Sequence, residues 1–135
     1  MKLLFSISFY TPYVSGLTLF VKRLAEKFAS ENYQCTVLTN RHKRRLKPTE
    51  TINRVRVARA MPIFSVSKGF LSIDFAVKSY IEAKNNNIIF INLPQFEGIF
   101  PAIFGKLMGK RVIAIYHCEV KLPSGILNFF SEMSL

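Results

Sequence analysis

The chain has 135 residues, half of them hydrophobic, and a formal net charge of +11. This length suits one domain, and the hydrophobic content supplies a core, which excludes a disordered chain. The excess charge is local, because residues 41–59 hold eight basic residues and one acid, a net charge of +7. The other 116 residues carry only +4. The basicity therefore belongs to one segment and not to the whole surface.

The two cysteines, Cys35 and Cys118, stand alone in different segments. They form neither a disulfide framework nor a CxxC pair, and lone thiols favour a reducing, cytoplasmic compartment. Only two histidines accompany them, and no ligand set has the spacing of a metal site, so we expect no metal. The longest uncharged run, residues 3–21, is interrupted by Pro12 and Gly16 and is not predicted to span a membrane.

The predicted elements alternate between strands and helices. Short apolar runs predict strands at residues 2–8, 35–39, 55–60, 88–91 and 112–116. Helical spacing of apolar residues predicts helices at residues 17–28, 70–84, 96–108 and 126–133. Continuously apolar strands joined by helices indicate an α/β fold with a doubly wound, Rossmann-like parallel sheet. Right-handed crossovers favour the strand order 3-2-1-4-5, numbered along the chain.

Ligands of such a sheet bind beyond the carboxyl ends of the strands, where the strand order reverses. Three loops converge at that point: residues 9–16, 92–97 and 117–122. Gly16 precedes the first helix, where unpaired amides and the helix dipole favour a phosphate, although an ordinary turn glycine would look the same. His117 follows the last strand directly, and Glu119 could orient its imidazole or simply be solvated.

The basic stretch RHKRR at residues 41–45 has three interpretations. It could be a solvated loop, or it could contact an anionic membrane surface, or it could bind nucleic acid. No aromatic side chains alternate with these charges and no nucleic-acid-binding motif accompanies them, so we expect no nucleic-acid partner. The residues expected at a membrane surface are Arg41, Lys43, Arg44 and Arg45.

Several segments are also distinctive as an ordered set. They are FYTPYVSG (9–16), FVKRLAEK (20–27), CTVLT (35–39), INLP (91–94), GKRVIAIYH (109–117) and KLPSG (121–125). The set covers nearly the whole chain and resembles the N-terminal half of group 1 (family 4) glycosyltransferases, which are retaining enzymes of the GT-B architecture.

The resemblance implies a domain that holds the acceptor and faces a second domain, which holds most of the nucleotide sugar. It implies that Gly16, beside Ser15, lies against the donor diphosphate and that His117 reaches the donor sugar near the reaction centre. It also implies catalysis without a metal or other cofactor. Further residues expected on the acceptor side or in support of the site are Pro12, Asn92 and Glu119. Two positions depart from the family: Ser15 replaces the first glycine of a common Gly-Gly pair, and Cys118-Glu119 replaces Asp or Ser-Asp after the histidine.

The C-terminal donor domain of that family, with its Glu-x7-Glu motif, has no counterpart here, and residues 126–135 resemble the opening of a further helix. We therefore expect residues 1–135 to form a single, incomplete N-terminal domain that is inactive alone. For the complete enzyme the resemblance implies hexosyl transfer from a nucleotide sugar to a saccharide or lipid-linked acceptor, in polysaccharide or glycolipid biosynthesis of the cell envelope. The expected location is the cytoplasm, including peripheral contact with the inner face of the plasma membrane.

Two other functions stay open. One is an NADP-type dinucleotide-binding domain, in which Arg41 and its neighbours after the second strand would meet the 2′-phosphate. The first turn lacks the G-x-G-x-x-G pattern of that class, since Gly16 stands alone. The other is a non-catalytic module that uses the basic segment to bind a membrane.

Overall fold

The computed structural model describes residues 1–13, 15–41, 43, 45–61, 64–66, 69–71, 73–93 and 98–116. Within them lies a six-stranded sheet of order β3-β4-β2-β1-β7-β8, parallel except at β3. Its strands are β1 (Lys2–Ser6), β2 (Gln34–Asn40), β3 (Thr49–Ile52), β4 (Val55–Ala60), β7 (Ile88–Leu93) and β8 (Arg111–Tyr116). A separate short antiparallel pair consists of β5 (Phe64–Val66) and β6 (Gly69–Leu71).

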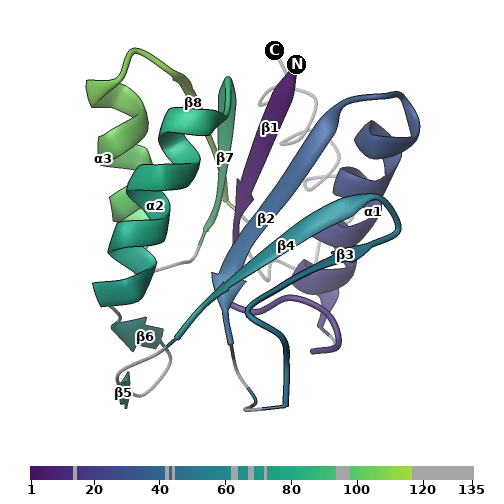
Figure 1. Cartoon of the computed structure of the whole chain (residues 1–135), viewed down its shortest axis with the longest axis vertical. Helices are drawn as coiled ribbons and strands as arrows, with labels where there is room; N and C mark the ends of the chain where they lie inside the picture. Colours follow the sequence, from purple (N-terminus) through teal and green to yellow (C-terminus); the bar gives the residue numbers. More distant parts are fainter. Residues whose placement is uncertain are drawn as a thin grey trace.

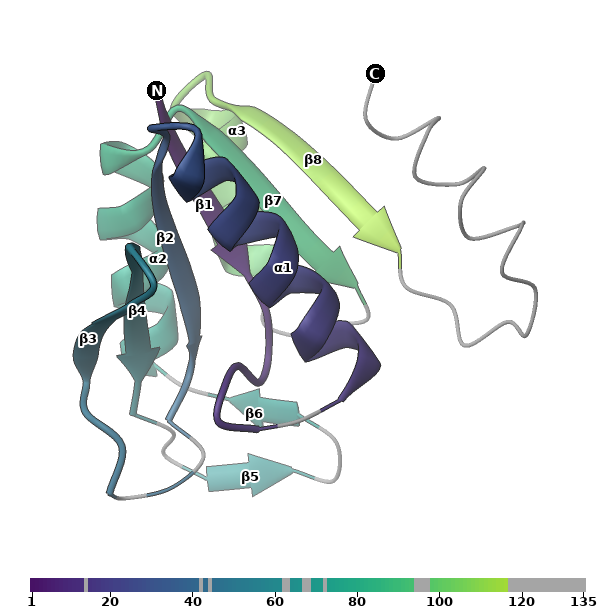
Figure 2. The ribbon, with the colours of Figure 1, turned by 90° about the vertical axis from the view of Figure 1, so that its right-hand side faces the viewer.

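Helices cover both faces of the sheet, as Figures 1 and 2 show. The helix α1 (Gly16–Ser30) lies on one face, and α2 (Ile73–Asn85) and α3 (Ile99–Leu107) lie side by side on the other. The predicted doubly wound α/β fold is thus confirmed, and the five predicted strands lie in the predicted order. Among the described residues no helix is long and apolar enough to cross a membrane.

The strand β3 at the sheet edge is a feature that the sequence did not predict. It pairs antiparallel with β4 through a tight turn at Asn53 and Arg54, both of which have positive φ, 49° and 69°. Its four residues alternate between exposed and half-buried positions, so no apolar run marks it. The β5–β6 pair likewise occupies a segment for which the sequence predicts no strand, and α2 begins at Ile73 and not at residue 70.

The core has two layers because successive side chains of a strand point to opposite faces of the sheet. Leu3 and Phe5 of β1 pack on the α1 side, whereas Leu4 packs on the side of α2 and α3. The Phe5 ring stacks on Phe90 of β7 with 4.9 Å between the centroids. Burial on both faces explains why the central strands are continuously apolar in sequence.

Two residues of α3, Pro101 and Gly105, allow this helix to form and to pack close to the sheet. Pro101 lies in the first turn of α3, where the missing N–H would have no partner in the helix anyway. At Gly105 a Cβ would lie only 2.6 Å from Ile89 Cδ1 and 2.8 Å from Val112 Cγ2. A glycine is therefore required there for α3 to approach β7 and β8 this closely.

The helix α2 turns its more apolar side away from the sheet, which is the reverse of the usual arrangement. An apolar stripe normally faces the core, yet Ile73, Val77 and Ile81 are between 47% and 70% exposed. The buried face carries Phe75 together with smaller or polar side chains, namely Ser79, Glu82 and Ala83. The apolar side of this helix predicted its existence, but that side points away from the sheet.

Candidate functional site

The reversal of strand order lies between β1 and β7, as predicted, because β1 pairs with β2 on one side and β7 on the other. The carboxyl ends of these strands and the N-terminal end of α1 lie at one edge of the sheet (Figure 2). This edge is where a doubly wound sheet receives a ligand. The loop from β1 to α1 brings Pro12, Ser15 and Gly16 to it.

The N-terminus of α1 is held by hydrogen bonds that Ser15 and Thr18 share. Ser15 is the N-cap, and its Oγ accepts from the Thr18 backbone N–H at 3.1 Å. The Thr18 hydroxyl is buried and donates to the carbonyl of Phe9 at 3.1 Å. The first turn contains no acidic residue, so no fixed negative charge of that turn opposes an anion at the positive end of the helix dipole.

Gly16 is the first residue of α1 and is exposed. A Cβ built on it would meet no atom within 4 Å. The fold itself therefore leaves room for a side chain at this position, and only a group bound from outside would need the backbone bare. Pro12, in the same loop, is exposed and follows a cis peptide bond.

Asn92 joins the two strands that flank the reversal point. It is fully buried near the end of β7, and its Nδ2 donates to the carbonyl of Ser6 in β1 at 3.0 Å. This bond fixes the relative position of the two strand ends below the loops. The predicted contact of Asn92 with an acceptor stays a prediction.

Three predicted site residues, His117, Glu119 and Arg44, lie outside the described residues. The expected pairing of His117 with Gly16 across one cleft therefore also stays a prediction. The structure does place the strand that precedes His117, since β8 ends at Tyr116 beside β7.

Sequence reasoning missed Arg59, which lies next to the candidate site. Its side chain is almost completely buried at the carboxyl end of β4. One guanidinium nitrogen donates to the carbonyl of Thr11 in the β1–α1 loop at 3.0 Å. The other donates to the carbonyl of Lys47 at 2.9 Å and to the Glu50 carboxylate. The sequence does contain a signal for this burial. Arg59 follows Val55 and Val57 at every second position of the strand, so its side chain is expected to point to the same core as theirs.

The basic segment is thus less uniform than its sequence suggests. Arg59 is buried, Arg56 pairs with Glu82 of α2 at 2.7 Å, and Arg41 donates to the sulfur of Met61. Lys43 and Arg45 are exposed. Contact of this segment with a membrane stays a prediction, now carried by fewer free charges.

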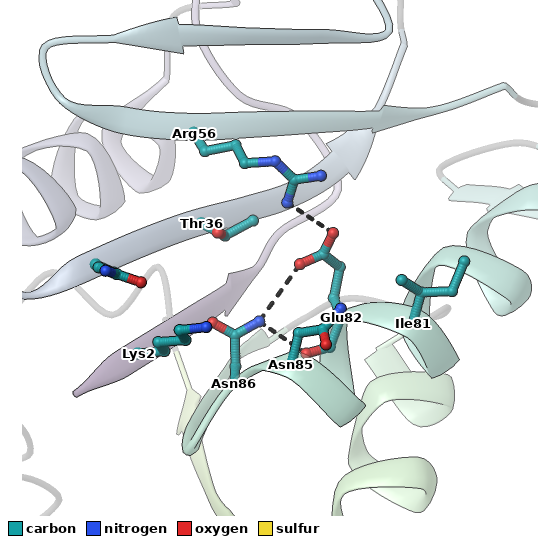
Figure 3. A pocket seen from close by; sticks show the side chains of 8 residues that line it. Lys2, Thr36, Arg56, Ile81, Glu82, Asn85 and Asn86 are labelled. Carbon is teal, nitrogen blue, oxygen red and sulfur yellow. Dashed lines mark hydrogen bonds and ion pairs between the residues drawn. The ribbon is translucent and has the colours of Figure 1, made fainter.

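A polar cavity of about 310 Å³ lies at the opposite edge of the sheet, near the amino ends of β1 and β2. Its lining includes Lys2, Arg56, Glu82 and Asn86, and Figure 3 shows the Arg56–Glu82 ion pair between β4 and α2. Asn86 Nδ2 donates to the Glu82 carbonyl at 2.7 Å. Arg56, Glu82 and Asn86 bind one another, and the cavity is remote from the strand ends that receive ligands in this fold.

Two buried ionisable groups on the α1 side are held neutral. Burial raises the pKa of Tyr10 far above its usual value, with a smaller contribution from the charge of Glu26. Burial also raises the pKa of the Cys35 thiol to about 11. Neither group suits a nucleophile or base at neutral pH. No group of three or more metal-ligating side chains occurs among the described residues.

Comparison with known proteins supports the fold. No family model matches the chain, and no curated protein matches its sequence. A solved sucrose-phosphate synthase from Thermosynechococcus elongatus is similar in structure, with a TM-score of 0.63 and 11% sequence identity. The similarity covers 98% of this chain and 39% of that one, so the chain spans well under half the length of this neighbour. At this identity the likeness shows the fold alone, which this chain shares with the matched part of that enzyme.

Proposed function

We propose that the chain forms the acceptor-side, N-terminal domain of a glycosyltransferase. The sugar would pass from a nucleotide-sugar donor to a saccharide or lipid-linked acceptor, with retention of anomeric configuration. The observation that carries the proposal is the open N-terminus of α1 at the reversal point of the sheet. The glycosyltransferase-like fold supports it.

In this proposal the α1 N-terminus receives the donor diphosphate. The cap at Ser15 orders the first turn, the exposed backbone of Gly16 allows close approach, and the helix dipole favours negative charge there. The buried amide of Asn92 and the guanidinium of Arg59 hold the surrounding loop and strand ends in place. His117 would stabilise charge that develops on the donor sugar, which would lower the reaction barrier.

The second domain of a GT-B enzyme would complete the diphosphate site, so the chain alone should bind a nucleotide weakly and should not transfer sugar. Weak binding is best followed residue by residue. We expect UDP or GDP to shift the amide NMR signals of Ser15, Gly16 and Leu17 in the purified chain, with little effect at the amino edge of the sheet.

The variant Gly16→Ala tests the site without disturbing the fold, because its methyl group meets no protein atom within 4 Å. Titration of these amide shifts should give an affinity for the nucleotide that is about tenfold lower than that of the parent chain. The control Leu19→Ala, on the same helix, should leave the affinity unchanged. Titration with NADP distinguishes the glycosyltransferase function from the alternative dinucleotide-binding function. If NADP shifted the signals around Arg41 more strongly than UDP or GDP shifted Gly16, the glycosyltransferase proposal would be wrong.

A further inference from the structure

The outward faces of α2 and α3 each carry a row of large apolar side chains. Those of α2 are Ile73, Val77, Tyr80 and Ile81, and those of α3 are Ile99, Ile103 and Leu107. Each is between 47% and 78% exposed. Spacings of four and eight residues place each set on one side of its helix, and a patch of this kind is unusual for a free surface.

The two rows belong to one surface because the helices pack directly against each other. The Tyr80 ring meets the Phe104 ring edge-on, with 5.5 Å between the centroids, and α2 and α3 lie side by side (Figure 1). Tyr80 is half exposed and therefore bridges the rows. We call the seven exposed apolar residues, four on α2 and three on α3, the α2–α3 apolar face.

Among the described residues of α2, α3 and the segment that follows α3, only two are acidic and the other charged residues are basic. Lys84 and Lys106 lie on the same exposed sides of α2 and α3, and Lys110 and Arg111 follow α3. The two acids of α2 are neutralised, since Asp74 pairs with Lys78 at 3.0 Å and Glu82 is buried against Arg56.

A further cation, Arg41, lies near the other end of α2. The Asp74 carboxylate accepts the Met61 backbone N–H at 2.8 Å, and the Met61 sulfur contacts the guanidinium of Arg41. These contacts place Arg41 near the N-terminal end of α2, at the opposite end of the helix from Lys84.

From this combination we propose that the α2–α3 apolar face docks on an anionic lipid surface, with its apolar side chains in the interface and its lysines at the headgroups. Burial of apolar area and attraction to anionic lipid act together in such binding. A protein partner would have to match both the apolar rows and the cations, whereas a lipid interface provides both layers without a specific shape. The inference concerns a different surface from the sugar-transfer site and does not depend on that activity.

The test is sedimentation of the 135-residue chain with vesicles of neutral phosphatidylcholine alone or mixed with phosphatidylglycerol. We expect binding to the mixed vesicles at low salt, weakened but not abolished at 1 M salt, where the Debye length is ~3 Å. The variants Val77→Glu and Ile103→Glu should each weaken binding by about tenfold or more. The matched control, Leu19→Glu on the outward side of α1, should bind as the parent chain does, because Leu19 is also exposed (40%) but lies on the other face of the sheet.

Four results would overturn the proposal. One is no preference for anionic vesicles at low salt, and another is equal binding by Ile103→Glu and Leu19→Glu. The third is a self-associated chain that Ile103→Glu converts to monomer while vesicle binding is absent, because the face would then be an interface between proteins. Loss of binding only in Lys43→Glu and Arg45→Glu would instead assign the contact to the basic segment and would equally refute the role of α2 and α3.

Discussion

The helices on the two sides of the sheet have opposite outward character. On α1 the exposed positions include Arg23, Lys27 and Ser30, while its buried positions are Thr18, Val21, Ala25 and Ala29. On α2 and α3 the exposed positions are mostly large and apolar. The α1 side has the polar, solvent-facing surface that is usual for a soluble domain. The α2–α3 side exposes apolar surface of the kind that is normally covered by another layer. The polarity of the exposed helix surface thus distinguishes a face that is solvated from a face that is suited to docking.

The two sides also differ in how they hold a buried charge. On the α1 side, Arg59 is enclosed near the carboxyl edge and serves two carbonyl groups and one carboxylate. On the other side, Glu82 is enclosed near the amino edge and pairs with Arg56, whose side chain is 46% exposed. The first charge is locked into the fold from several directions, and the second is reached by solvent through its partner.

The largest expected effect comes from removing the enclosed charge of the α1 side. Arg59→Ala should lower the free energy of unfolding by about 3 kcal/mol or more, because it leaves buried acceptors without a donor. Urea unfolding followed by circular dichroism measures it. Arg23→Ala on the exposed side of α1 is the control and should change stability by less than about 0.5 kcal/mol. Equal losses in the two variants would show that the buried hydrogen bonds of Arg59 do not stabilise the fold.

An intermediate effect is expected where α3 meets the sheet. Gly105→Ala should cost about 1–3 kcal/mol, because its Cβ would overlap Ile89 and the stiff side chain of Val112. Gly16→Ala is the matched control, since the same methyl group meets open space there and alanine is a better helix former. We expect the control to be neutral or slightly stabilising in the same urea experiment. A tolerated Gly105→Ala would mean that the α3 layer is looser than the structure describes.

The smallest effect concerns the chemistry of Cys35 on the α1 side. Its pKa of about 11 keeps the thiol protonated at pH 8, and only 4% of the residue is exposed. In a Cys118→Ser background, Cys35 should react with a thiol reagent far more slowly in the folded chain than in urea. The raised pKa also has a defined consequence for stability. Between about pH 9 and 11 the unfolded thiol ionises while the folded one does not, so folding should become less favourable as the pH rises. Rapid labelling of the folded chain at pH 8 would contradict this burial.

The sequence by itself determined the central strands, their order and the start of α1. Long apolar runs identify strands buried on both faces, and right-handed crossovers leave few possible orders. The helical spacing of apolar residues from residue 17 placed the start of α1 within one residue of its observed start at Gly16. These features depend on neighbours in the chain, and for that reason they are readable from it.

Only the tertiary structure decided which way the helices face and which cations are enclosed. The apolar stripe of Val77 and Ile81 predicted a helix, but its orientation depends on the whole sheet, which here accepts Phe75, Ser79 and Ala83 instead. Arg59 resembles its basic neighbours in sequence, yet its partners Thr11 and Glu50 are 48 and 9 residues away. Burial and ion pairing are sums over contacts distant in the chain, so no local pattern of charge or hydrophobicity could specify them.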